Sequence, residues 1–247
     1  MRRRLDAELV RRGLVQSRAR AVEAIEAGRV LVSGAPATSA ARQVAPDDAV
    51  HVTAAPAGDV YVSRGGHKLA AALNAFAIDV NGRTAVDVGA STGGFTDCLL
   101  QRGAAHVVAV DVGRGQLAWS LRNDPRVTVL ERVNVRELHE PVCEPAPDLC
   151  TVDVSFISLR TIAHNLLEIT APSAEFVLLV KPQFEAGRDR VGKGGVIRDA
   201  SVREAVVSEV LEGLDAHGLA VSAVIESPLH GADGNVEYLA RAQRRAA

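Results

Sequence analysis

From residue 84 to residue 180, short apolar runs alternate with segments in which apolar residues recur at helical spacing. Short runs rich in Val and Leu are typical of strands buried on both faces, and their alternation with helices indicates parallel strands joined by crossover helices. The runs are TAVDV (84–88), HVVAVD (106–111), RVTVL (126–130), LCTVDV (149–154) and EFVLLV (175–180). This pattern predicts an α/β domain over residues 64–247, with a mostly parallel sheet and helices on both faces.

The C-terminal end of the chain departs from this alternation. LAVSAVIESP (219–228) and GNVEYLARA (234–242) are both strand-like, and a loop containing Pro and Gly separates them. Two strand-like segments joined in this way predict a terminal antiparallel hairpin.

The first 58 residues predict a separate, small α+β domain. LDAELVRRG (5–13) predicts a short helix that ends at Gly13. SRARAVEAIEAG (17–28) predicts a second helix, with Ser17 as its N-cap. RVLVSG (29–34) and DDAVHV (47–52) predict strands. The small, Pro-containing segment TAAPAGD (53–59) is typical of a linker, and we place the linker between the two domains at 59–63.

Composition excludes several classes of protein. The chain of 247 residues is 47% apolar and 23% charged, which is normal for a soluble globular protein, and no apolar run approaches the roughly 18 residues of a membrane-spanning helix. The basic N-terminus lacks the apolar stretch of a secretory signal, so we expect a cytoplasmic protein without membrane contact. The three cysteines are scattered without metal-ligand spacing, which predicts neither disulfides nor a metal site.

The net charge of −2 is unevenly distributed, because residues 1–58 carry nine Arg against six acids and residues 59–247 carry 19 basic residues against 24 acids. A basic N-terminal segment favours contact with phosphates. The pattern SRARAVEAIEAGRVLVSG (17–34) resembles the small RNA-binding fold named after ribosomal small-subunit protein four. The alternative is a solvated helical pair without a ligand. The RNA-binding candidates in this domain are Arg4, Arg11, Arg12, Arg18, Arg20 and Arg29.

A Gly-rich turn in VDVGASTGGFT (86–96) joins a predicted strand to a predicted helix, the place where α/β sheets bind ligands. The run from Gly89 is GASTGG and lacks the close-spaced second glycine of the dinucleotide fingerprint, which argues against NAD. Asp111 lies 22 residues beyond Gly89 at the end of the next strand, where a carboxylate can accept from a ribose diol. Asp87 could meet an ammonium group or ordered water.

The absence of basic residues from this turn favours the cationic ligand S-adenosylmethionine over a phosphate. A purely structural turn is the alternative. Gln116 and Trp119 could line an adenine pocket, with Trp119 in the core as the other possibility, and Asn134 could approach the adenine edge. The predicted cofactor-binding residues are Asp87, Gly89, Ala90, Ser91, Gly93, Gly94, Phe95, Asp111, Val112, Gln116 and Asn134.

Lysine is rare in this chain: of 28 basic residues only Lys68, Lys181 and Lys193 are lysines. A guanidinium stays protonated in proteins, whereas an amine can lose its proton, so a lysine at the end of a buried strand is a candidate for chemistry. Lys181 has that position, although a surface lysine is the alternative. Lys193 lies in GRDRVGKGGVIRD (187–199), which predicts a mobile loop that closes over RNA or a solvated loop without a ligand.

Seven motifs spread over the whole chain resemble those of the TlyA family, whose members are two-domain rRNA 2′-O-methyltransferases, some of them labelled haemolysins. Their catalytic domain is similar to that of the FtsJ/RrmJ ribose methyltransferases. The motifs are YVSRGGHKL (61–69), DVGASTGGF (87–95), DVGRGQLAWSLRNDPRV (111–127), VDVSFISL (152–159), LLVKPQFE (178–185), GKGGVIRD (192–199) and GNVEYL (234–239).

The resemblance implies a Rossmann-like methyltransferase sheet, S-adenosylmethionine as cofactor, and a Lys-Asp-Lys-Glu tetrad. It also implies a target cytidine in large-subunit rRNA, small-subunit rRNA or both, within the assembled subunit, and an effect on susceptibility to ribosome-binding antibiotics. It predicts no protein partner and leaves the oligomeric state open. By motif, the tetrad falls on Lys68, Asp153, Lys181 and Glu237.

We expect Lys181 to contact the 2′-oxygen and help to deprotonate it, with Asp153 orienting this lysine and Lys68 and Glu237 fixing the geometry. Which lysine accepts the proton stays open. An RNA-binding factor with an inactive catalytic domain would be expected to lack part of the tetrad, which is intact. A pore-forming haemolysin would need an export signal or an insertion segment, and a nicotinamide oxidoreductase would need the missing glycine.

Overall fold

The computed structural model describes residues 2–15, 17–26, 28–53, 60–192, 194–231 and 234–245. The chain forms two compact units, Met1–Val60 and Tyr61–Ala247. Residues 54–59, which include the start of the predicted linker, lie outside the described residues. None of the described helices combines the length and the apolarity that crossing a membrane requires.

The larger unit is built on a seven-stranded sheet in the order β11-β12-β10-β9-β6-β7-β8. The five strands from β6 to β10 are parallel, whereas β12 is antiparallel to both β10 and β11 and so closes a terminal hairpin. The strands are β6 (Thr84–Val88), β7 (His106–Asp111), β8 (Val127–Glu131), β9 (Leu149–Val152), β10 (Glu175–Val180), β11 (Leu219–Glu226) and β12 (Tyr238–Arg244).

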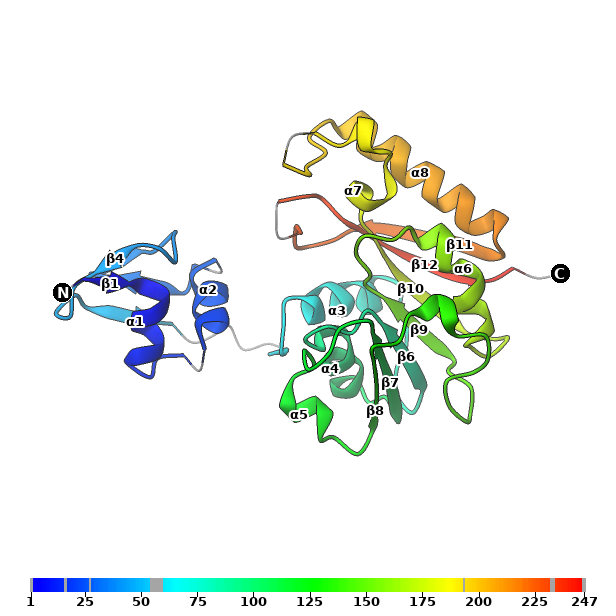
Figure 1. Ribbon diagram of the computed structural model, residues 1–247, viewed down its shortest axis with the longest axis horizontal. Helices are drawn as coiled ribbons and strands as arrows, with labels where there is room; N and C mark the ends of the chain where they lie inside the picture. Colours follow the sequence, from blue (N-terminus) through cyan, green and yellow to red (C-terminus); the bar gives the residue numbers. More distant parts are fainter. Residues whose placement is uncertain are drawn as a thin grey trace. The chain divides into compact units, whose positions relative to one another are not determined.

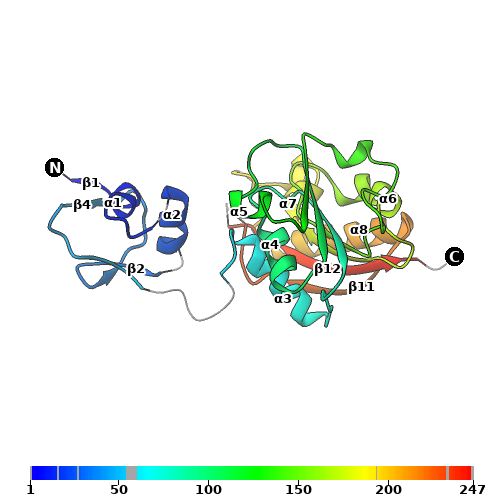
Figure 2. The ribbon, with the colours of Figure 1, turned by 90° about the horizontal axis from the view of Figure 1, so that it is seen from below.

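Helices cover both faces of this sheet (Figures 1 and 2). One face packs on α3 (Gly65–Ala75), α4 (Gly94–Gln101) and α5 (Trp119–Arg122), and the other on α6 (Leu159–Glu168) and α8 (Ala200–Ala216). Three shorter helices, η1 (Val135–Glu137), α7 (Pro182–Glu185) and η2 (Arg188–Arg190), lie in the connections.

Alternation along each strand divides the apolar side chains between two cores. In β7, Val108 and Val110 join the core under α6 and α8, whereas Val107 and Ala109 join the core under α3 and α4. The strands are therefore buried on both faces, which explains their nearly continuous apolar character. The predicted fold class, a Rossmann-like sheet with a terminal hairpin behind a small α+β domain, is confirmed.

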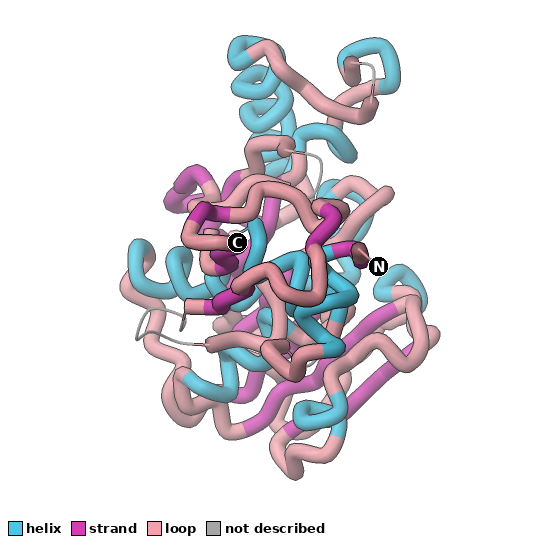
Figure 3. Tube along the Cα trace, turned by 90° about the vertical axis from the view of Figure 1, so that its left-hand side faces the viewer, coloured by secondary structure: helices cyan, strands magenta, loops and turns pink. Residues whose placement is uncertain are grey.

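The small unit contains two helices, α1 (Leu5–Arg11) and α2 (Arg18–Glu26), together with short strands (Figures 1 and 3). Its core includes Leu5, Leu9 and Ile25. Both predicted helices and both predicted strands are present. The remaining strands have two residues each, too few to show a period in the sequence. The strands are β1 (Arg3–Arg4), β2 (Val30–Val32), β3 (Ala35–Pro36), β4 (Gln43–Val44) and β5 (Val50–Val52), in a β1-β4 pair and a β3-β2-β5 sheet.

Candidate active site and nucleic-acid interface

Three members of the predicted tetrad come from strand ends at one edge of the sheet. Asp153 directly follows β9, and its N–H donates to the Val88 carbonyl at 2.9 Å. Lys181 directly follows β10, which ends there because Pro182 has no N–H for the ladder. Glu237 directly precedes β12, which runs antiparallel to β10, so it reaches the same edge as the carboxyl ends of the parallel strands.

The tetrad forms two ion pairs. Lys181 Nζ lies 2.5 Å from Asp153 Oδ1 and donates to Ser155 Oγ at 3.1 Å. Lys68 Nζ, from the first turn of α3, donates to Glu237 Oε2 at 2.5 Å. Both lysine side chains are 11% exposed, but Asp153 is 26% exposed and Glu237 only 3%, so the Lys181 pair is the more open of the two to a substrate.

Close packing of two helix starts brings Lys68 beside the Gly-rich turn. A Cβ on Gly94, the first residue of α4, would overlap Ser63 Oγ and lie 2.9 Å from the backbone nitrogen of Gly66 in α3. Only glycine allows this approach. The first turn of α3 therefore lies against the turn that precedes α4, which places the Lys68–Glu237 pair near the predicted cofactor loop.

The loop residues Ser91, Asp111 and Gln116 form one hydrogen-bonded group. The backbone nitrogen of Ser91 donates to Asp111 Oδ2 at 2.7 Å, and that of Gly113 donates to Oδ1 at 2.6 Å. Ser91 Oγ donates to Gln116 Oε1 at 3.2 Å. Each carboxylate oxygen of Asp111 accepts one of these bonds and keeps the capacity to accept another, as a ribose diol requires.

The surroundings of this group fit S-adenosylmethionine. Gly89 has φ +85°, and a Cβ there would overlap the Asp153 carbonyl, so the turn brings bare backbone to the edge of the sheet. Val112, next to Asp111, is exposed and offers an apolar contact for a base. Residues 89–94 contain no basic side chain, so no positive charge in this loop repels the positively charged sulfonium. Trp119 is exposed and does not belong to the core.

Three predicted cofactor residues have other roles in the structure. Ala90 and Phe95 are buried in the core under α3 and α4, where they support the turn. Asn134 follows β8 and caps η1, because its Oδ1 accepts from the backbone nitrogen of Arg136 at 3.1 Å. The neighbouring Val133 N–H donates to the Asp111 carbonyl at 3.1 Å, which keeps Asn134 close to the loop.

Asp87 was expected to meet an ammonium group or ordered water, but its side chain is fully buried and accepts hydrogen bonds from two threonines. Asp87 Oδ2 accepts from Thr96 Oγ1 at 2.7 Å and Oδ1 accepts from Thr151 Oγ1 at 3.1 Å. Alternation in β6 turns this position toward α4 instead of toward a ligand. Burial, opposed by the two hydroxyl hydrogen bonds, raises the pKa of Asp87 to about 7.

We expect Asp87→Asn to change how stability depends on pH. Because the pKa of Asp87 in the folded chain is about 7 and that of an unfolded Asp is about 3.9, the folded state binds more protons between these values. The stabilisation that the folded state gains from protonating Asp87 is therefore complete below about pH 4 and is lost as pH rises to about 7. Asparagine does not titrate, so the variant gains a few kcal/mol relative to wild type across that interval. Urea unfolding of both proteins from pH 4 to 8 measures the difference, and a flat difference curve would contradict this assignment.

The predicted RNA-binding arginines of the small unit fall into two groups. Arg4, Arg11 and Arg18 are exposed and form ion pairs with the buried carboxylates of Asp6 and Glu8. Arg12, Arg20 and Arg29 are partly buried. Lys193, the remaining candidate, lies outside the described residues.

Arg12 forms hydrogen bonds within the small unit. Its Nε donates to Glu8 Oε1 at 2.8 Å, and its Nη1 donates to the Asp48 carbonyl at 2.8 Å. Its Nη2 donates to the carbonyls of Ala45 and Pro46 at 3.1 and 3.0 Å. These four hydrogen bonds give Arg12, which was predicted to bind RNA, a structural role within the small unit.

We expect Arg12→Lys to destabilise the small unit by about 1–3 kcal/mol, because an ammonium cannot reproduce the planar fork and leaves carbonyls without a donor. The matched control is Arg11→Lys on the same helix, since Arg11 contacts only Glu8 among the partners that the described residues provide. Hydrogen exchange of residues 2–53 in the full chain measures both variants. Equal protection in the two variants would show that the carbonyl contacts of Arg12 contribute nothing.

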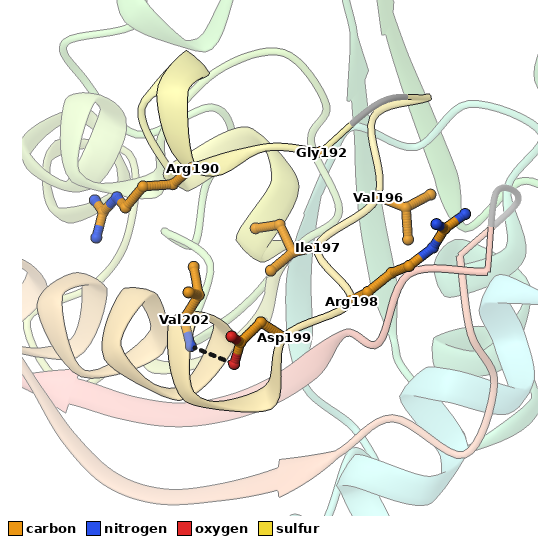
Figure 4. Close-up of a pocket in the computed structure, with 7 residues that line it drawn as sticks. All are labelled: Arg190, Gly192, Val196, Ile197, Arg198, Asp199 and Val202. Atoms are coloured by element: carbon orange, nitrogen blue, oxygen red, sulfur yellow. Dashed lines mark hydrogen bonds between the residues drawn. The ribbon is translucent and has the colours of Figure 1, made fainter.

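The segment before α8 is held to the loop that precedes β12 and lines a pocket of about 210 Å³ (Figure 4). The buried Ile197 donates its N–H to Asn235 Oδ1 at 3.1 Å, and Arg190 pairs with Glu209 on α8. None of the tetrad or cofactor-loop residues lines this pocket. The lining residues are Arg190, Gly192, Val196, Ile197, Arg198, Asp199 and Val202.

Several side chains in these sites were not predicted from the sequence. Ser155 contacts Lys181, and its only signal is its place two residues after Asp153 in the quoted motif. Thr96 in α4 and Thr151 in β9 donate to Asp87, and no local sequence pattern predicts this role for them.

Comparison with known proteins identifies both units. The FtsJ-like methyltransferase model matches residues 61–244, and the S4 domain model matches residues 3–50. A 16S/23S rRNA (cytidine-2′-O)-methyltransferase TlyA from Mycobacterium tuberculosis is 52% identical over 237 residues, which cover 96% of this chain and 88% of that protein. Hemolysin A from Brachyspira hyodysenteriae is 41% identical, with 96% of this chain and 98% of that protein covered.

A solved structure from Streptococcus thermophilus, provisionally described as a hemolysin, has a TM-score of 0.79 and 38% sequence identity. The alignment of the two structures covers 100% of this chain and 90% of the S. thermophilus chain. The resemblance inferred from the seven motifs is thereby confirmed. The chain belongs to the TlyA family, which joins an S4 domain to an FtsJ-like methyltransferase domain.

Proposed function

We propose that this protein transfers a methyl group from S-adenosylmethionine to the 2′-hydroxyl of a cytidine in ribosomal RNA. Membership of the FtsJ-like methyltransferase family makes S-adenosylmethionine the cofactor. The M. tuberculosis relative is named for cytidine 2′-O-methylation of 16S and 23S rRNA. The observation that carries the proposal is the partly exposed Lys181–Asp153 pair at the edge that also holds the Gly-rich turn.

The cofactor, when bound, supplies a methyl group that is already activated by its sulfonium. Alignment of the acceptor is then the main task of the protein. In its neutral form, Lys181 uses its two N–H donors for Asp153 and Ser155, which leaves the lone pair of Nζ to face the 2′-hydroxyl. Asp153 fixes the amine, and its carboxylate stabilises the ammonium that forms when Lys181 Nζ takes up the hydroxyl proton.

The second ion pair orients the first. Lys68 and Glu237 are buried, and Glu237 precedes the strand that pairs with β10, so the position of Lys181 depends on them. A buried pair of this kind resists rearrangement, because separating its partners would leave an uncompensated charge. Asp111, Ser91 and Gln116 would hold the nucleoside part of the cofactor, and the exposed Val112 would offer an apolar contact to its base.

The small unit binds rRNA through its exposed arginines, and the target is an assembled ribosomal subunit. A subunit substrate places the protein in the cytoplasm. Attack on a 2′-hydroxyl inside folded rRNA requires the target nucleotide to leave its stack. No protein partner is needed for this assignment.

The test is methyl transfer to separated, unmodified small and large ribosomal subunits with labelled S-adenosylmethionine. We expect the label to be retained in one or both rRNAs at a cytidine. The phosphodiester bond that follows this cytidine should resist alkaline cleavage, because the 2′-oxygen is blocked. Label on a base, or no label with either subunit, would refute the proposed function.

A further inference from the structure

Asp6 is a buried carboxylate that lies beneath two exposed arginines of the small unit. Its side chain is 3% exposed, whereas those of Arg4 and Arg18 are 47% and 62% exposed. Arg4 donates from Nε to Oδ1 and from Nη2 to Oδ2, each at 3.1 Å, and Arg18 donates from Nη2 to Oδ2 at 2.7 Å. The two guanidinium groups therefore share one carboxylate oxygen and lie side by side.

The three residues come from three different elements. Arg4 is in β1, where it pairs with Gln43 of β4, Asp6 is in the first turn of α1, and Arg18 begins α2. Asp6 is further held by its own backbone, because its N–H donates to the Ala40 carbonyl at 3.2 Å and its Oδ1 accepts from the Ala7 nitrogen at 2.8 Å. Arg4 and Arg18 therefore come together at Asp6 only in the folded unit.

The charges of this group leave a net positive site. Two guanidinium groups repel one another at this separation, and a single carboxylate between them permits the approach while leaving one positive charge in excess. Each guanidinium carries five N–H donors, of which Arg4 gives two and Arg18 one to Asp6. The other donors belong to the exposed part of the two side chains, where they suit the oxygens of a phosphate.

Comparison with Arg12 shows that this group is more than a structural network. Arg12 is 20% exposed and donates to three backbone carbonyls, as expected of a residue that holds the fold. Arg4 and Arg18 are far more exposed, and within the described residues their side-chain hydrogen bonds go to Asp6. Hydrogen bonding from Arg4 is the largest cause that lowers the pKa of Asp6 to about 2, so the carboxylate stays ionised at neutral pH.

We propose that Asp6 is a positioning residue that fixes Arg4 and Arg18 as a clamp for one phosphate of the RNA backbone. The inference rests on the proposed rRNA substrate and names the contact by which the small unit holds it. Because both guanidinium groups are ordered before RNA arrives, binding loses less side-chain entropy than it would with free arginines.

The experiment compares Asp6→Asn with Asp47→Asn in the full chain, using the unmodified ribosomal subunits as the probe. Asp47 is an exposed carboxylate of the same unit, so both variants remove one negative charge. Loss of negative charge alone strengthens RNA binding. We expect Asp47→Asn to bind as tightly as wild type or slightly more tightly. Asp6→Asn should bind about tenfold more weakly at physiological salt, with a slope of log K against log salt that is smaller by about 1.

Two further readouts separate positioning from a general loss of structure. Asp6→Asn should raise KM for the subunit without changing kcat or KM for S-adenosylmethionine. In a background that carries Arg4→Gln and Arg18→Gln, Asp6→Asn should have no further effect on binding, because the residues through which it acts are gone.

The outcomes distinguish this inference from the proposed function. Asp6→Asn binding like Asp47→Asn, or a weakening that persists without the two arginines, would overturn the clamp while leaving methylation intact. Subunit binding by the wild type without methyl transfer would refute the enzyme assignment and still test the clamp through the binding constants. A wild-type protein that binds neither subunit would overturn both.

Discussion

Replacing Lys181 with arginine is expected to lower the rate of rRNA methylation at saturating substrates by about 10²–10⁴-fold, the range for loss of a positioned proton acceptor. A guanidinium keeps the positive charge but cannot accept a proton. It is also too large for a site in which Lys181 already lies 2.5 Å from Asp153 and 3.1 Å from Ser155. Single-turnover methylation of the responsive subunit measures the effect.

The binding steps serve as controls for this variant. Affinity for S-adenosylmethionine and for the subunit should stay within a few-fold of wild type, because neither of the proposed binding groups includes Lys181. Ser155→Ala should reduce the rate by a smaller factor, since it removes one orienting contact and leaves the amine. Full activity of Lys181→Arg would show that positive charge suffices and that another group takes the proton.

Gly89→Ala is expected to destabilise the larger unit by about 3 kcal/mol or more and to abolish methylation. The first cause is the backbone, because φ is +85° and an L-residue there costs roughly 1–2 kcal/mol. The second is the overlap of the new Cβ with the Asp153 carbonyl, a backbone atom that cannot move without shifting β9 from β6. That shift displaces the carboxylate that orients Lys181. Urea unfolding and the methylation rate report the two effects.

The matched control lies at the other end of the same strand. Gly82 precedes β6 and has φ +74°, and a Cβ at this position would meet nothing within 4 Å. Gly82→Ala therefore carries the backbone cost alone, about 1–2 kcal/mol, and should keep its activity. If both variants lost the same stability, the contact between the Gly-rich turn and Asp153 would have no energetic weight.

The larger unit was predictable because its strands are buried on both faces, which gives each a local apolar signature. The β7 run HVVAVD, for example, serves two cores at once and leaves little ambiguity about its state. Two-residue strands such as β1 and β4 have no such signature, and they exist only because Arg3 and Arg4 lie beside Gln43 and Val44 in the folded unit. Local pattern predicts an element only where the element is long enough to carry a period.

The candidate site likewise has features that the sequence predicts and features that depend on the folded structure. The motifs singled out the four residues that form the two ion pairs, and the candidate turn and Asp111 were chosen from their places at strand ends. The difference between a partly exposed pair and a buried pair could not be predicted, because Lys68 and Glu237 are 169 residues apart and meet through the packing of α3 against the sheet. Asp87 was expected to meet the ligand because its position in the motif does not tell on which face of β6 its side chain lies or what packs against it there.

Residue type and spacing along the chain were enough to establish the order of strands and helices, the Gly-rich turn without the phosphate fingerprint, and the few lysines and acids available for chemistry. Which charged groups are exposed and which are used internally depends on the folded chain, in which Arg12 holds the small unit together while Arg4 and Arg18 share Asp6 at its surface. The physical reason is that burial and hydrogen-bond partners are set by contacts between distant segments, and a charge has a different role in water from the one it has beneath another side chain.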